Sequence, residues 1–151
     1  MSQWKLLASH SLNFYRIDSH LSNFASSSIL RKLQKLELVF WFDGGLLANY
    51  PSLKPTVYCQ EIKKRASRAC GILATAENLR VVVVSWVDTT ADGAGEEKKG
   101  VLGALKVLDA TKVKIEIGVL EWSGAQAGRQ REQWEKMVRG WIEDVYAVEA
   151  S

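Results

Sequence analysis

The fold is decided by a stretch that occurs twice, first as Leu36-Glu37-Leu38-Val39-Phe40-Trp41-Phe42-Asp43 and again as Val81-Val82-Val83-Val84-Ser85-Trp86-Val87-Asp88. The pattern fades into a third copy over residues 113–122, which ends on Glu121 and Trp122. Short runs rich in β-branched and aromatic residues are typical of strands. We therefore predict strands at residues 36–42, 79–87 and 113–122, with the second one central and the third at an edge.

A segment of helical period follows each predicted strand. The first helix is expected to begin near Pro55, which suits a first helical turn, and to end near Asn78. The second opens at Glu96 and runs to about Leu108, and the third is C-terminal, around Trp134. Because parallel strands need a long crossover between them, a strand–helix repeat favours a parallel sheet.

The alternation in the first and third predicted strands decides which faces of the sheet are covered. A sheet with helices on both faces would show continuous apolar strands, whereas residues 36–42 and 113–119 alternate with polar residues. We predict an α/β fold, namely an open, mainly parallel sheet of three to four strands with helices on one face, in leucine-rich-repeat-like βα units. We expect a single domain, with three such units in residues 31–151.

Opposite the helices this prediction leaves an apolar stripe, for which we expect the residues Val39, Trp41, Val82, Val84 and Trp86. Contiguous apolar surface of this kind is normally covered. The N-terminal residues 1–30 are predicted to be a covering segment, and a protein partner is the alternative. Self-association is a third possibility.

Length and composition exclude several classes of protein. The chain has 151 residues, a formal net charge of +3 and no apolar run near the roughly 20 residues of a membrane helix. Its first residues lack the basic-then-apolar build of a secretory signal. We expect a cytoplasmic or nuclear protein with no membrane partner.

Cysteine and histidine are sparse. Cys59 and Cys70 fall in one predicted helix, about 16 Å apart along its axis, which is too far for a disulfide. The only two histidines are His10 and His20, so few ligands exist for a structural metal. We expect buried free thiols and no cofactor.

A basic run at residues 63–68 raises the question of nucleic-acid binding. Lys63, Lys64, Arg65 and Arg68 lie on the predicted polar side of the first helix, without interleaved aromatic residues. Charge of that kind is usually a solvated helix face, so nucleic acid is not an expected partner.

Catalytic motifs are absent or incomplete. Gly93-Ala94-Gly95 lies between a strand and a helix but matches no phosphate-binding pattern, and Glu96 and Glu97 would repel an anion there. Asp43, Asp88 and Glu121 end the three predicted strands and would meet at the carboxyl edge of a parallel sheet, with Trp41, Trp86 and Trp122 beside them. Such acids could hold Mg²⁺ and such rings could stack on a ligand.

The order of apolar segments resembles the C-terminal region of a class of uncharacterised filamentous-fungal proteins, some of which carry an F-box. The resemblance is carried by residues 33–42, 69–73, 79–88, 96–108 and 113–117. It implies irregular leucine-rich-repeat-like units that form a substrate-recognition or interaction module without catalysis. No F-box-like helical stretch precedes residue 10, so docking to a ubiquitin-ligase adaptor is not expected.

Together these observations predict a non-catalytic protein-interaction module whose partner the sequence does not identify. The alternative is a small metal- or ligand-binding enzyme with its site at Asp43, Asp88 and Glu121.

Overall fold

A computed structural model describes residues 4–8, 29–90, 96–123 and 127–150. Its centre is a four-stranded sheet in the order β1-β2-β3-β4, in which every neighbouring pair is parallel. The strands are β1 (Trp4–Ala8), β2 (Lys35–Phe42), β3 (Val81–Asp88) and β4 (Lys114–Trp122). The predicted open parallel sheet is confirmed, with β3 inside it and β4 at an edge.

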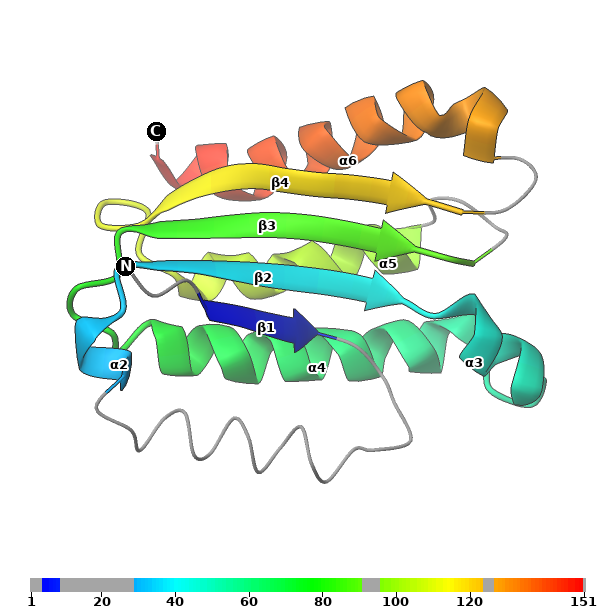
Figure 1. The fold of residues 1–151 in the computed structure, drawn as a ribbon, viewed down its shortest axis with the longest axis horizontal. Helices are drawn as coiled ribbons and strands as arrows, with labels where there is room; N and C mark the ends of the chain where they lie inside the picture. The colour runs from blue at the N-terminus through cyan, green and yellow to red at the C-terminus, as the bar shows by residue number, and fades with distance from the viewer. Residues whose placement is uncertain (1–3, 9–28, 91–95, 124–126, 151) are drawn as a thin grey trace.

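The helices lie on one side of this sheet (Figure 1). The long ones are α4 (Pro55–Leu73), which follows β2, and α6 (Ala127–Ala150), which follows β4. Between β3 and β4 the chain forms α5 (Glu96–Val101) and a 3₁₀ helix, η1 (Leu102–Val107). Two short helices, α2 (Ile29–Lys32) and α3 (Gly44–Asn49), flank β2.

Two local expectations differ from the structure. The first is that α4 ends at Leu73 instead of near Asn78, and the short helix α3 lies between β2 and α4, in a segment for which no element was predicted. The helix expected over residues 96–108 divides, because the chain tightens into η1 after Val101. Each change shortens a helix or adds one without altering the order of strands.

The core lies between the sheet and the long helices. On β2 and β3 the residues that point towards the helices are paired in register and are fully buried: Leu36 with Val82, Leu38 with Val84, and Phe40 with Trp86. The Trp86 ring packs 4.6 Å from the Phe42 ring and 6.3 Å from the Trp141 ring of α6, measured between centroids. Both cysteines are free and buried, as expected.

The side of the sheet away from α4, α5 and α6 is called the open face. On β2 and β3 it is formed by Lys35, Glu37, Val39, Trp41, Val81, Val83, Ser85 and Val87. On β4 it continues through Lys114, Glu116 and Glu121, which pair in register with residues of β3 on that side.

The predicted apolar stripe is wrong for three of its five residues. Val82, Val84 and Trp86 are each 0% exposed and face the helices. Val39 and Trp41 do lie on the open face, where Val39 is 3% exposed and Trp41 is 39% exposed.

The predicted N-terminal covering segment is only partly described. Residues 4–8 form β1, which extends the sheet beside β2 and does not cross its open face. Residues 9–28 lie outside the described residues.

A β-bulge interrupts β4 near its middle. Between its pairings with Val84 and Trp86, β4 carries one extra residue, around Gly118. A Cβ on Gly118 would lie 2.4 Å from the Ser85 Oγ, so this close approach of two strands requires glycine. Ser85 fixes the bulge, since its hydroxyl accepts the Val119 N–H at 3.1 Å and donates to Glu37 Oε2 at 2.6 Å.

Over the described ranges, none of the helices combines the length and apolarity that crossing a membrane requires.

Replacing Trp86 with alanine should lower the free energy of unfolding by about 3–5 kcal/mol, because it empties the centre of the core. Trp41→Ala should lower it by about 1 kcal/mol or less, because that ring is partly in solvent. Urea unfolding followed by circular dichroism measures both values. Similar losses in the two variants would contradict the assignment of the faces.

Candidate functional site

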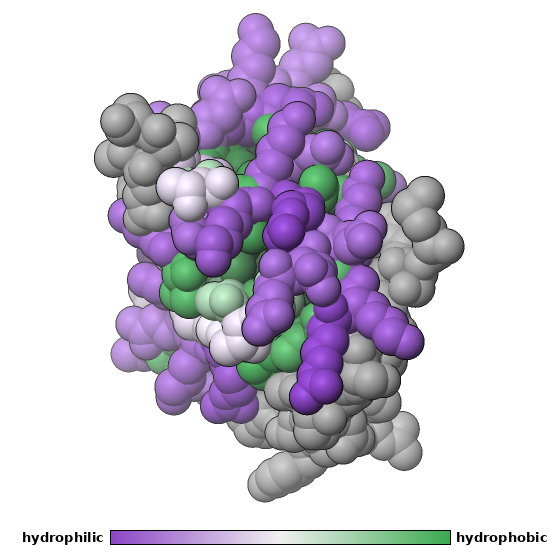
Figure 2. All heavy atoms as spheres, turned by 90° about the vertical axis from the view of Figure 1, so that its left-hand side faces the viewer, coloured by the Kyte–Doolittle hydropathy of each residue, from purple (hydrophilic) through white to green (hydrophobic). Residues whose placement is uncertain are grey.

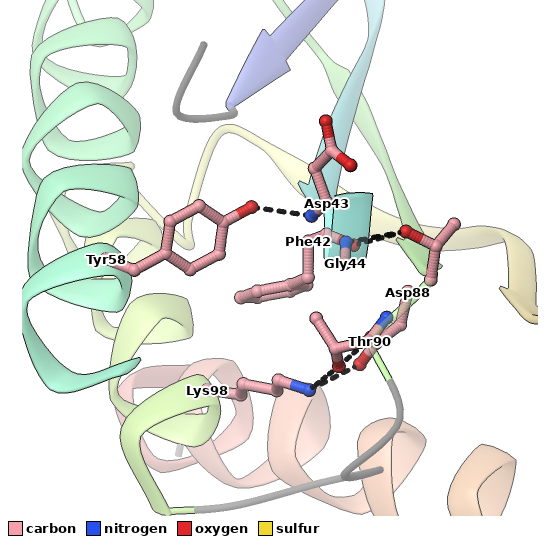
Figure 3. A network of polar contacts seen from close by, with 8 residues as sticks. Phe42, Asp43, Gly44, Tyr58, Asp88, Thr90 and Lys98 are labelled. Carbon is pink, nitrogen blue, oxygen red and sulfur yellow. Dashed lines mark hydrogen bonds and ion pairs between the residues drawn. The ribbon is translucent and has the colours of Figure 1, made fainter. Parts of the chain in front are cut away.

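Polar side chains from β3 and α5 meet at the carboxyl edge of the sheet (Figure 3). Asp88 ends β3, and its Oδ2 lies 2.8 Å from the Nζ of Lys98 in α5, with side-chain exposures of 0% and 6%. Lys98 also donates to Thr90 Oγ1 at 2.6 Å, and that hydroxyl donates to Asp88 Oδ1 at 2.5 Å. The network is therefore closed within the protein.

The buried charges of this network are compensated. Asp88 Oδ1 accepts a second hydrogen bond from the Thr90 N–H at 2.9 Å. The Lys98 ammonium lies 5.4 Å from the centroid of the Phe42 ring, where the electron-rich face of an aromatic ring attracts a cation. Since both carboxylate oxygens of Asp88 are engaged, the pair ties α5 to the end of β3.

A second set of contacts fixes the turn after β2. The Asp43 N–H donates to the Tyr58 hydroxyl of α4, and Asp43 Oδ1 accepts the Gly45 N–H at 2.9 Å. The Gly44 N–H donates to Thr89 Oγ1 at 2.8 Å, and a Cβ on Gly44 would lie 2.3 Å from the Thr89 carbonyl oxygen. Glycine is required there because the chain segments after β2 and β3 touch.

Burial governs the ionisation of Tyr58. Loss of solvent around its hydroxyl outweighs the lowering effect of the Asp43 N–H and, together with the nearby Asp43 carboxylate, raises the pKa of Tyr58 to about 12. The phenol is thus held neutral as a structural acceptor.

The three strand-end acids do not form a metal site. Asp88 pairs in register with Trp122 on the helix side, whereas Glu121 pairs with Val87 on the open face. Successive residues of a strand point to opposite faces, so the two carboxylates are separated by the sheet. Within the described ranges no cluster of three or more His, Cys, Asp or Glu could hold a metal ion, and the predicted grouping of Asp43, Asp88 and Glu121 is wrong.

The three tryptophans beside these acids are also divided. Trp86 and Trp122 are 0% and 8% exposed, and Trp122 packs against Trp134 of α6 at 5.9 Å between ring centroids. Only Trp41 is exposed, so the expected stacking surface of three rings does not exist.

A small pocket of about 230 Å³ lies between the carboxyl ends of β3 and β4. It is lined by Val87, Asp88, Thr89, Glu121, Trp122, Ser123 and Arg131. Arg131 already donates to Glu135 at 3.2 Å. Among the described lining residues there is no histidine or cysteine, and of the two acids Asp88 is already paired with Lys98.

The open face is the other candidate site, and it differs in kind from the carboxyl edge. Its apolar part combines Trp41, Val87 and Val119, of which Val119 is 52% exposed beside the bulge of β4. At its amino end Lys35 and Glu116 form an ion pair of 3.6 Å. This surface can bind by apolar contact.

Sequence reasoning missed Val81, Val83, Val87 and Val119 as residues of the open face. The sequence carries no clear signal for the phase of β3, because residues 81–84 are all valine, and in the structure the core side of the strand begins at Val82 and reaches Asp88. The bulge hides Val119, since the extra residue reverses the alternation of β4 after Ile117.

The glycine-rich segment Gly93-Ala94-Gly95 of the sequence lies outside the described residues. In the basic run of α4, Lys63, Lys64 and Arg68 are exposed as expected, but Arg65 is 6% exposed, so its assignment to the solvated side is wrong.

Comparison of the chain with protein-family models, with curated proteins and with solved structures finds no match in any of the three.

Breaking the buried ion pair should be costly. Lys98→Met leaves the Asp88 carboxylate buried without its counter-charge and should lower the free energy of unfolding by about 3–5 kcal/mol. The double variant Asp88→Asn/Lys98→Met should lose clearly less than the sum of the two single variants. Lys63→Met, at an exposed position of α4, is the matched control and should change stability by about 0.5 kcal/mol or less. Additive losses in the cycle would show that the two groups do not interact.

The raised pKa of Tyr58 predicts a loss of stability at alkaline pH. The folded state keeps the phenol proton to about pH 12, whereas the unfolded chain releases it near pH 10, so stability should fall as the pH rises between these values. In urea titrations across that range, Tyr58→Phe should show a shallower fall than the wild type. The exposed Tyr50 provides the control variant Tyr50→Phe, which should behave like the wild type. An unchanged slope in Tyr58→Phe would refute the assignment.

Proposed function

We propose that this chain is a non-catalytic protein-interaction module and that the open face is its contact surface. One observation carries the proposal: Trp41 and Val119 are 39% and 52% exposed on a sheet face that none of the described helices covers. Exposed tryptophan is enriched among the residues that dominate the affinity of protein interfaces. The expected partner is a protein surface of apolar character.

The arrangement of the open face supports this role. The exposed apolar residues Trp41 and Val119 lie towards the carboxyl half of the strands, and the Lys35–Glu116 ion pair lies at the amino end. An apolar centre beside a charged rim is the usual anatomy of a protein interface. The Glu37 carboxylate accepts the Ser85 hydroxyl, so the one acid near the centre is already hydrogen-bonded before any partner arrives.

The alternative, a metal- or ligand-binding enzyme at the strand ends, has lost its main support. Asp88 is neutralised by Lys98, and Glu121 lies on the other face of the sheet. The resemblance to fungal interaction modules points in the same direction as the proposal. Leucine-rich-repeat-like recognition of a protein substrate is therefore part of what we propose.

Photo-crosslinking tests the surface directly. A benzophenone amino acid placed at position 41 or 119 should capture the same protein from an extract of the native cells, and one placed at position 63 on α4 should not. The captured protein is then purified and titrated against the wild-type chain. Trp41→Ala should weaken this binding by about 30-fold, the loss typical of a central tryptophan at an interface.

Val57→Ala is the matched control for that titration. Val57 is 43% exposed but lies in the first turn of α4, so this variant should bind like the wild type. Equal loss in both variants, or capture that does not depend on the position of the crosslinker, would contradict the proposal.

A further inference from the structure

Among the described strands β4 ends the sheet, so one side of its backbone has no neighbouring strand. The Lys114 N–H donates to the Arg80 carbonyl at 2.8 Å, towards β3. Because backbone groups alternate along a strand, the N–H and C=O groups of Ile115 and Ile117 point away from β3.

The helix α6 lies next to the position that a fifth strand beside β4 would occupy. In Figure 1, α6 follows the outer side of β4 along the edge of the sheet. Between them is a groove of about 470 Å³, lined by Ile115, Glu116, Ile117, Arg139, Ile142, Glu143 and Tyr146. A second hollow of about 330 Å³ shares Ile115 and Tyr146 with it and reaches the loop before β4.

The Tyr146 side chain of α6 already provides a hydrogen bond to the backbone at the start of this edge. Its hydroxyl donates to the Val113 carbonyl at 2.8 Å, which fills the first outward-facing acceptor of the edge. The following residues, 114–117, form a regular stretch before the bulge, and residues 115–117 line the groove. Unpaired backbone groups beside an apolar groove are the features that a bound strand uses.

A positive and a negative side chain lie at opposite ends of the β4 edge. Lys114 is exposed at the amino end of β4 and Glu121 is exposed near its carboxyl end, and neither forms an ion pair within the described part of the chain. Lys112 adds a second positive charge beside Lys114 and lines the second hollow. Figure 2 views the molecule from the amino ends of the strands, where hydrophilic side chains surround smaller apolar areas.

From these observations we propose that β4 binds an extended peptide segment of a partner protein as a fifth strand, with an acidic residue beside Lys114 and a basic residue beside Glu121. Alternate side chains of the segment are apolar and enter the groove against Ile115, Ile117 and Ile142. The backbone groups that would pair lie at the outer edge of β4, whereas the side chains of Lys114 and Glu121 also belong to the open face.

The bulge and the charges of β4 make this edge selective. Bulges and charged residues on edge strands discourage indiscriminate pairing with other sheets. Here the extra residue of the bulge means that a regular seven-residue segment spans β4 from Lys114 to Glu121. A segment with the wrong charges at its ends meets like charges at both.

Two fluorescein-labelled peptides test the proposal by fluorescence anisotropy at low salt. One has the core sequence Glu-Leu-Thr-Val-Thr-Leu-Lys, and the other exchanges the two charged ends. The wild-type chain should bind one of them about tenfold more tightly than the other, and the preferred member reports whether the added strand is parallel or antiparallel. The double variant Lys114→Glu/Glu121→Lys should reverse the preference.

Controls separate edge pairing from general stickiness. N-methylation of the central residues of the preferred peptide removes backbone donors and should abolish binding. Lys63→Glu reverses a charge on α4 and should leave the preference unchanged, and matched thermal unfolding shows that each variant is folded. Equal binding of both peptides, a preference that survives the double charge exchange, or no binding of either peptide would overturn the proposal.

Discussion

The pairing of β2 with β3 is the constraint on which the rest of the structure depends. It places Phe40 beside Trp86 and Leu36 beside Val82, which gathers the largest apolar side chains on one face. That face requires cover, and α4, η1 and α6 supply it. The opposite face then receives Trp41 and Val87, so the exposed surface of the sheet follows from the same register as its core.

The polar network at the carboxyl edge follows from this core. The carboxylate of Asp88 continues the buried side of β3, and a buried charge is stable only when it is paired. Lys98 provides the pairing and thereby fixes the start of α5. The strand-end acid Asp88 therefore has a structural role, and this supports placing the proposed contact surface on the open face.

Much of the fold could be predicted from the sequence, because the strand and helix periods are strong and each strand is followed by a helix. The candidate site could be predicted only in part. The two copies of the repeat place Trp41 and Trp86 at equivalent positions, yet the strands pair with an offset of one residue and put the two rings on opposite faces. Neither this offset nor the bulge at Gly118 leaves a mark in apolar patterning, because both arise from contacts between strands.

The central claim is that the sheet has one buried and one accessible face, and hydroxyl-radical footprinting read by mass spectrometry tests it most directly. Trp41 and Trp86 have the same intrinsic reactivity, so their labelling rates in the native protein compare the two faces. The account predicts rapid oxidation of Trp41 and strong protection of Trp86, with both rings labelled alike after unfolding in urea. Equal protection of the two rings in the native protein would mean that the open face is covered, and would contradict the account.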